Sequence, residues 1–168
     1  MSKAFKNIRA LALGGMLTAL CLTIMVLGGA LGIGTYACPV ICSLVLMPLG
    51  LKYGARSQLA AYIATGALSF ILVSDRELSL MFLVFFGWYP MLAPRLEKIK
   101  KPLNLLVKLL VFNITVVPAE IFAIKVLLCE AETTGVLIAM WAVGNLTFLL
   151  YDRLLPRLEI AIRVKLGK

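Results

Sequence analysis

The sequence is divided into six apolar segments by short polar connectors, and this pattern limits the folds that the chain can adopt. A helix needs about 20 consecutive apolar residues to cross the hydrocarbon core of a bilayer. It also satisfies its backbone hydrogen bonds internally, which lipid requires of any spanning segment. We therefore predict an all-α integral membrane protein, a compact bundle of six transmembrane helices in a single domain over residues 1–168. The predicted spans cover about 8–30, 35–51, 55–73, 78–94, 103–128 and 134–155.

The composition agrees with insertion into a lipid bilayer. Hydrophobic residues make up 62% of the chain and charged residues 15%, whereas soluble domains are closer to half apolar and a quarter charged. The first segment follows the basic residues Lys3, Lys6 and Arg9, as a signal peptide would. Its apolar run is longer than that of a signal peptide, and TYAC, which ends at Cys38, is a poor lipoprotein cleavage site, so we predict a span.

The basic residues gather at one side of the predicted membrane. With the N-terminus inside the cell, all but two of the 17 lysines and arginines fall on the cytoplasmic side, the exceptions being Arg76 and Lys125. This bias follows the rule that cytoplasmic loops carry an excess of Lys and Arg. It predicts that both termini are cytoplasmic, and it explains the net charge of +9 without nucleic acid as a partner.

Missing residue types argue against most enzyme classes. The chain has no histidine, so a Ser-His-Asp triad and an HExxH zinc site are both impossible. It also has no P-loop motif for ATP. The two aspartates, Asp75 and Asp152, fall on opposite sides of the predicted membrane, which excludes an aspartyl dyad. We therefore expect no catalytic residue, no metal site and no cofactor.

The four cysteines are best explained as small apolar residues. Cys38 and Cys42 are four positions apart and would share a helix face, but a metal site is disfavoured in a chain without histidine. A disulfide between Cys38 and Cys129 remains open, because both residues are predicted near the outer surface.

The stretch NITVVPAE, residues 113–120, places polar groups inside the fifth apolar segment. Asn113 and Glu120 are seven residues apart, or two turns, and so share one helix face. Pro118 has no N–H and leaves the carbonyl of Ile114 without its usual helical donor. A carboxylate in a span costs about 2.5–3.5 kcal/mol on insertion scales, and its default interpretation is functional. We predict that Glu120 contacts a solute and that Asn113 forms an interhelical hydrogen bond.

The sixth segment carries a matching polar face, formed by Thr134, Trp141, Asn145 and Asp152. At about 1.5 Å per residue, Asn113 and Asn145 each lie roughly 15 Å from the cytoplasmic end of their helix. We therefore predict that the two asparagines meet at one depth, in a hydrogen bond worth about 0.6 kcal/mol. Glu120 and Trp141 would both lie nearer the outer surface.

Small residues recur every four positions along the first segment. They form two rows, Ala10-Gly14-Thr18 and Gly15-Ala19-Thr23. Such faces let another helix approach closely in lipid. The pattern fits packing within the bundle and docking of a partner protein equally well.

The aromatic run FFGWYP, residues 85–90, lies near the predicted cytoplasmic end of the fourth span. Its position predicts an aromatic belt at the membrane interface, in preference to a site where rings stack on a ligand.

Together these features resemble the substrate-binding S component of an energy-coupling factor (ECF) transporter. The resemblance rests on six short spans with both ends inside, on ALALGGMLTAL in the first span, and on polar residues toward the outer ends of spans five and six. The segments PLGLKYGARSQLAAY, FLVFFGWYPMLAPRLEKIK and NLTFLLYDRLLPRLE resemble uncharacterised bacterial members grouped with these S components. The implied location is the bacterial cell membrane.

The resemblance implies a function and a set of partners. S components capture a vitamin or similar small solute on the outer side and dock on a transmembrane coupling protein, which two cytoplasmic ATPases drive. The docking face of the first helix would be Ala10, Gly14, Gly15 and Ala19, a departure from the strict alanine pattern of the family. The substrate-binding residues would be Tyr36, Arg76, Glu120, Trp141 and Asn145.

The charges on the predicted outer side favour one kind of solute. Besides Glu120, they sum to −2, from Arg76, Lys125, Asp75, Glu77, Glu130 and Glu132. This sign favours a solute with an amine or another cationic group. The alternative function is a membrane scaffold similar to MreD-like cell-shape proteins, in which Glu120 and the asparagines would hold the bundle together or bind a partner helix.

Overall fold

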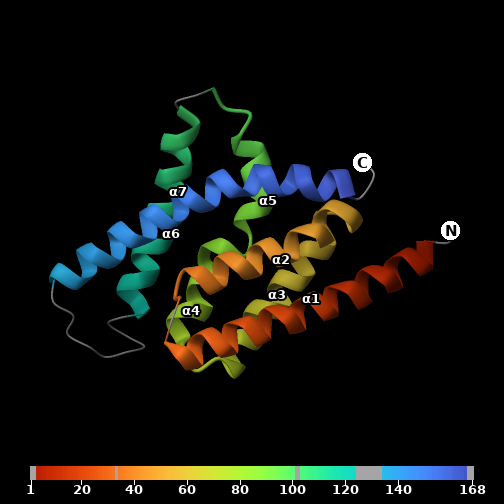
Figure 1. Cartoon of the computed structure of the whole chain (residues 1–168), viewed down its shortest axis with the longest axis horizontal. Coiled ribbons are helices and arrows are strands. Elements are labelled where there is room, and N and C mark those ends of the chain that lie inside the picture. Colours follow the sequence, from red (N-terminus) through yellow and green to blue (C-terminus); the bar gives the residue numbers. More distant parts are fainter. Residues whose placement is uncertain (1–2, 33, 101–102, 124–133, 166–168) are drawn as a thin grey trace.

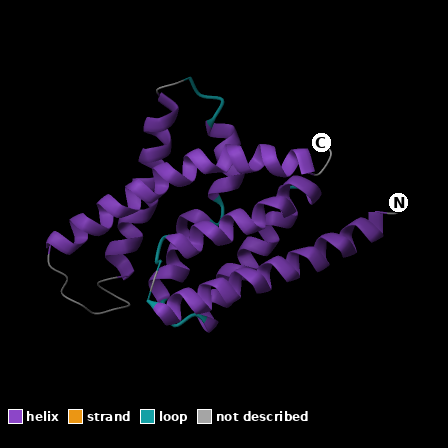
Figure 2. Cartoon of the chain, viewed as in Figure 1, coloured by secondary structure: helices purple, strands orange, loops and turns teal. Residues whose placement is uncertain are grey.

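The computed structural model describes residues 3–32, 34–100, 103–123 and 134–165. All regular secondary structure in these ranges is helical, and they contain no strand (Figure 2). The helices are α1 Lys3–Leu31, α2 Ala37–Tyr53, α3 Ala55–Leu72, α4 Arg76–Met81, the π-helix η1 Phe82–Phe86, α5 Tyr89–Leu96, α6 Leu103–Phe122 and α7 Thr134–Lys165. The predicted all-α class is therefore confirmed for the described residues.

Three helical stretches of the described chain are long and apolar enough to cross a membrane: Asn7–Leu31, Arg76–Leu96 and Leu103–Phe122. They coincide with the first, fourth and fifth predicted spans. Helix α2 is also apolar but shorter. The chain thus has helices typical of a membrane protein, whereas the number of six crossings and the orientation of the termini stay predictions.

The helix ends depart from the predicted spans in two places. Helix α7 continues to Lys165, beyond the predicted limit near 155, and Pro156 lies inside it. The fourth predicted span is divided into α4, η1 and α5, where the Gly87 amide donates to the Phe82 carbonyl over 2.8 Å. Hydropathy marks where charged residues begin, but backbone hydrogen bonding decides where a helix ends. Residues 124–128 of the fifth predicted span lie outside the described residues.

Helices α1, α2 and α3 pack against one another, and α7 runs in the same general direction as α2 and opposite to α1 (Figure 1). Helix α6 crosses α7 steeply in this view. The start of α1 and the ends of α2 and α7 lie on the right of Figure 1, while the end of α1 and the starts of α2 and α7 lie toward its lower left. The short connectors therefore join antiparallel helices at the α1–α2 turn, as predicted, but α6 departs from a simple bundle.

Aromatic side chains fill the core where α6 and α7 meet η1 and α5. The ring centroids are 4.7 Å apart in the stacked pair Phe85–Tyr89 and also in the stacked pair Phe112–Phe148. Phe85, Phe86 and Tyr89 are fully buried, so the predicted aromatic belt is wrong for these three residues. Their large rings bury more area against α6 and α7 than an interfacial position would allow.

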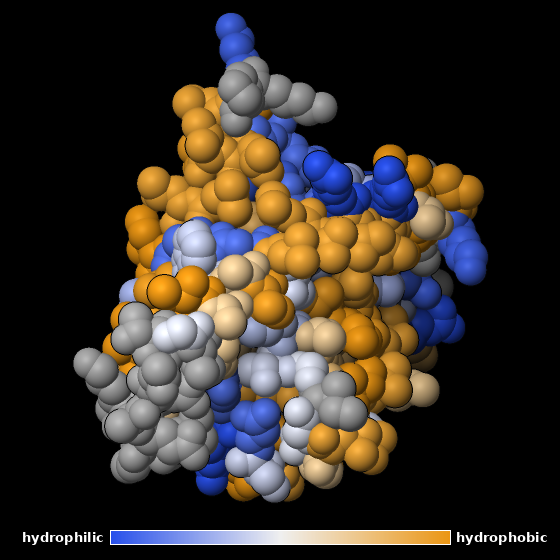
Figure 3. Space-filling model, turned by 60° about the vertical axis from the view of Figure 1, so that its left-hand side comes forward, coloured by the Kyte–Doolittle hydropathy of each residue, from blue (hydrophilic) through white to orange (hydrophobic). Residues whose placement is uncertain are grey.

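Apolar side chains also cover much of the surface, as Figure 3 shows for one face. Leu11 on α1, Leu110 on α6 and Leu150 on α7 are all exposed. Exposed apolar surface of this extent marks contact with lipid or with other proteins.

Candidate functional site

The carboxyl group of Glu120 lies buried in the last turn of α6. The hydroxyl of Tyr36, which directly precedes α2, donates a hydrogen bond to Oε1 of Glu120. The same hydroxyl lies 3.5 Å from the backbone carbonyl oxygen of Met140 on α7. Tyr36 therefore joins three helices at one point, and it brings together two of the predicted substrate-binding residues that are 84 positions apart.

A cavity of about 600 Å³ opens beside Tyr36, between the start of α2 and the first half of α7. This volume is within the range of small-molecule sites, roughly 300–1,000 Å³. Its walls carry small and apolar side chains besides the tyrosine ring, from Gly34, Thr35, Ala37, Gly135, Ala139, Met140, Val143 and Thr147. Of the five predicted substrate-binding residues, Tyr36 lines this cavity, and Glu120 is connected to it through the tyrosine hydroxyl.

Trp141 and Asn145 form a separate hydrogen-bonded cluster with Asn113. The Asn113 Nδ2 donates to Asn145 Oδ1 over 3.0 Å, and the Trp141 indole donates to Asn113 Oδ1 over 2.7 Å. The predicted meeting of the two asparagines is confirmed. Their amide groups are largely used in holding α6 to α7, and the half-exposed Trp141 is tied to the same contact.

Arg76 takes a different position from the other predicted binding residues. It begins α4, its side chain is exposed, and its guanidinium donates to the backbone carbonyl of Phe70 on α3. The structure thus directs Arg76 toward α3, and the Tyr36–Glu120 contact is built without it. Asp75 caps the same helix, because its Oδ1 accepts from the Leu78 amide over 3.1 Å.

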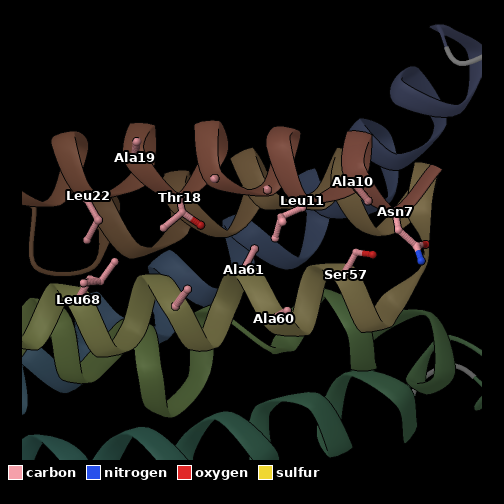
Figure 4. Close-up of a pocket in the computed structure, with 13 residues that line it drawn as sticks. Asn7, Ala10, Leu11, Thr18, Ala19, Leu22, Ser57, Ala60, Ala61 and Leu68 are labelled. Carbon is pink, nitrogen blue, oxygen red and sulfur yellow. The ribbon is translucent and has the colours of Figure 1, made fainter. Parts of the chain in front are cut away.

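The small residues of α1 line a groove of about 640 Å³ between α1 and α3 (Figure 4). All four residues of the predicted docking face contribute to it: Ala10, Gly14, Gly15 and Ala19. In Figure 4, Ala10 and Thr18 of α1 face Ser57 and Ala61 of α3. A methyl group added at Gly15 would meet no other atom within 4 Å, whereas one at Gly14 would touch Leu49 on α2. The 3.5 Å contact at Gly14 is an ordinary one, so packing within the described chain requires a glycine at neither position.

An ion pair between a buried lysine and a partly buried aspartate, at the other end of α6, was not predicted. The ammonium of Lys108 lies 2.8 and 3.1 Å from the two carboxylate oxygens of Asp152, and the Tyr89 hydroxyl donates to Asp152 Oδ1 over 2.6 Å. Lys108 is only 4% exposed, although the sequence placed it among the cytoplasmic charges. The sequence contained a signal for this pair. If two antiparallel helices are aligned so that Asn113 meets Asn145, Lys108 comes to lie opposite Asp152.

Two predictions about cysteines and outer charges fall partly outside the described residues. Cys38 is buried near the start of α2, but Cys129 lies in the undescribed range 124–133, as do Lys125, Glu130 and Glu132.

Comparison of the chain with protein-family models, with curated proteins and with solved structures found no match.

Proposed function

We propose that this protein is a membrane-embedded subunit that binds a small solute from the outer side of the bacterial cell membrane. In this proposal it acts as the S component of an ECF-type transporter. The observation that carries the proposal is the buried Tyr36–Glu120 pair beside a cavity of about 600 Å³. A carboxyl group inside a membrane protein is costly, and such groups mark pathways and binding sites for ligands.

The membrane topology supports access to this site from outside. The six-span prediction puts the start of α2, the end of α6 and the start of α7 at the outer surface, which is where the Tyr36–Glu120 pair lies. The exposed leucines of α1, α6 and α7 supply surface for lipid contact. The distribution of basic residues predicts that both termini are cytoplasmic.

The chemistry of the pair favours a solute with a cationic group. Glu120 accepts one hydrogen bond from Tyr36, and the Met140 carbonyl lies 3.5 Å from the same hydroxyl as an alternative acceptor. An amine on the solute can therefore take over the carboxylate while the tyrosine turns to Met140. Hydrogen bonds to charged groups contribute about 1.5–3 kcal/mol, enough to make this contact a main determinant of specificity.

The α1–α3 groove supports the second half of the proposal, which is docking on a transmembrane coupling protein. Gly15 and Ala19 are exposed, and the groove is open at Gly15. Close approach of a partner helix to small residues is a main source of helix association in lipid. Two cytoplasmic ATPases on that partner would supply the energy to reorient the loaded subunit.

The test is purification with and without the Glu120→Gln substitution. We expect the unsubstituted protein to retain a small molecule that mass spectrometry detects, and to support saturable uptake with its partners. Glu120→Gln should abolish retention while thermal stability stays nearly unchanged, because glutamine still accepts from Tyr36. Glu159→Gln is the matched control, since Glu159 pairs with Arg163 far along α7.

A second candidate, the membrane scaffold, is favoured by the extent to which polar groups already satisfy one another. Asn113, Trp141 and Asn145 form one internal cluster, and Glu120 has Tyr36 as a partner. In that case Glu120→Gln would have no effect on any ligand, and no solute, ATPase or coupling protein would copurify with the unsubstituted protein. This result would overturn the transport proposal.

A further inference from the structure

A second cavity lies at the end of α6 that is remote from Glu120. It has a volume of about 670 Å³ and lies among the residue that follows α5, the first turns of α6 and the second half of α7. We call it the basic basin and define it by its polar residues, Glu97, Asn104, Lys108, Asp152, Arg153 and Arg157.

The charges of the basic basin leave an excess of one positive charge. Lys108 and Asp152 neutralise each other over 2.8 Å, and Glu97 lies 4.0 Å from the same ammonium. Arg153 and Arg157 are four residues apart on α7, so they project from one helix face. Both are exposed, and neither forms an ion pair within the described part of the chain. Two guanidinium groups one turn apart match the geometry of a phosphate.

Asn104 provides an independent sign of a ligand. Its side-chain oxygen is buried and has no hydrogen-bond partner among the described residues. Buried polar groups are normally paired, and an exception calls for a missing partner. A hydroxyl of a ligand headgroup would donate to this oxygen, and a flipped amide would instead donate to a phosphate.

The rim of the basin identifies the class of ligand. Leu105 lines the cavity and is exposed, and its sequence neighbours Leu103 and Leu106 on α6, and Leu154 next to Arg153 on α7, are exposed as well. A soluble phosphate compound would gain nothing from this apolar rim, whereas acyl chains would bury it. On the predicted topology the basin faces the cytoplasmic leaflet, where basic pockets between helices bind anionic lipid headgroups.

We propose that the basic basin binds the phosphate of an anionic phospholipid. Arg153 and Arg157 contact the phosphate, Asn104 contacts the headgroup, and the acyl chains lie against the leucines of α6 and α7. The bound lipid would hold the end of α6 to α7 next to the Lys108–Asp152 pair. The inference rests on the membrane placement in the proposed function, but it does not depend on the solute or on partner subunits.

The test measures lipid binding to the purified full chain in mild detergent by native mass spectrometry. The probes are phosphatidylglycerol and phosphatidylcholine with the same acyl chains. The test variant is Arg153→Gln/Arg157→Gln. The control is Lys52→Gln/Arg56→Gln, which removes the same charge from exposed residues on the same predicted side, away from the basin.

We expect the chain to bind phosphatidylglycerol more tightly than phosphatidylcholine. The test variant should weaken phosphatidylglycerol binding about tenfold or more, since each basic residue near an anionic headgroup contributes about fivefold. The control should change binding less than about twofold, because charges beyond a Debye length are largely screened. Unchanged thermal unfolding of both variants would show that they remain folded.

Three results would overturn the proposal. Equal binding of the two lipids would show that the headgroup charge is not recognised. Equal weakening by the test and control variants would assign binding to general surface charge. Displacement of the lipid by inorganic phosphate at the same concentration would assign the basin to a soluble phosphate compound. A failure to detect solute or uptake would leave lipid binding intact, so the two proposals fail separately.

Discussion

The buried carboxyl group of Glu120 on α6 and the partly buried one of Asp152 on α7 differ in what balances them. Asp152 has the Lys108 ammonium at 2.8 Å and the Tyr89 hydroxyl at 2.6 Å. Glu120 has the Tyr36 hydroxyl, and no lysine or arginine of the described residues forms a salt bridge with it. A buried charge is stable when it is both paired and hydrogen-bonded. The Asp152 end is therefore complete by itself, whereas the Glu120 end has room for a cation from outside the chain.

The largest effect should come from removing the counter-charge of Asp152. Lys108→Met leaves the partly buried Asp152 carboxylate without its counter-charge. Breaking a buried pair typically costs about 3–5 kcal/mol, and the partial exposure of Asp152 favours the lower end of this range. We expect a strong fall in thermal stability in detergent, measured against Lys98→Met at an exposed position on the α5–α6 connector.

The double substitution Lys108→Met/Asp152→Leu sharpens this prediction. Replacing both charges by apolar groups is often neutral, so most of the lost stability should return. If Lys108→Met were as stable as the Lys98→Met control, the ion pair would not hold the two helices together.

Tyr89→Phe should have the next largest effect. It removes the donor to a charged carboxylate and leaves the fully buried ring in place, at a cost of about 1.5–3 kcal/mol. Unfolding temperatures compared with Tyr53→Phe provide the measurement, because the Tyr53 hydroxyl makes no hydrogen bond within the described chain. A loss no greater than that of Tyr53→Phe would show that Lys108 alone stabilises Asp152.

Some features of α6 and α7 could be predicted from the sequence. Spacing along one helix places Asn113 and Glu120 on a common face, and both residues do lie on the continuous helix α6. The Asn113–Asn145 contact was predicted from similar distances to the predicted helix ends; the contact is present, although α7 extends to Lys165 and the two distances to the observed ends differ. The fixed rise per residue gives spacing along one helix, but a comparison between two helices also needs their true ends, which hydropathy misplaced for α7.

Contacts that depend on rotation between helices were harder to predict. Lys108 was assigned to the cytoplasmic surface because hydropathy treats a lysine near a span end as solvated, whereas a facing Asp152 keeps it buried. The FFGWYP run was assigned to the interface because single-helix patterns do not show which rings another helix will cover. The π-helical register of η1, which directs these rings inward, has no signature in the apolar periodicity.

Tyr36→Phe tests the Glu120 site directly. It removes the donor to Glu120, and we expect a loss of about 0.5–1.5 kcal/mol, as for a hydrogen bond between neutral groups. The loss should be smaller than for Tyr89→Phe because no fixed cation holds Glu120 in its charged form, so the carboxyl group can remain neutral. The comparison uses unfolding temperatures of the two variants under identical conditions. An equal or larger loss for Tyr36→Phe would contradict the proposed contrast between the Glu120 and Asp152 sites.

The smallest effect is expected midway between the two ends, at the asparagine pair. Asn113 and Asn145 exchange two hydrogen bonds, of 3.0 and 3.4 Å, with no charge on either partner. Interhelical hydrogen bonds in membrane proteins average about 0.6 kcal/mol, because the separated helices also find other partners in the membrane. A double-mutant cycle of Asn113→Ala and Asn145→Ala should therefore give a coupling energy of about 0.6 kcal/mol. A coupling as large as that between Lys108 and Asp152 would show that neutral amides hold α6 and α7 as firmly as charges do. The contrast between the paired Asp152 and the unpaired Glu120 would then lose its electrostatic basis.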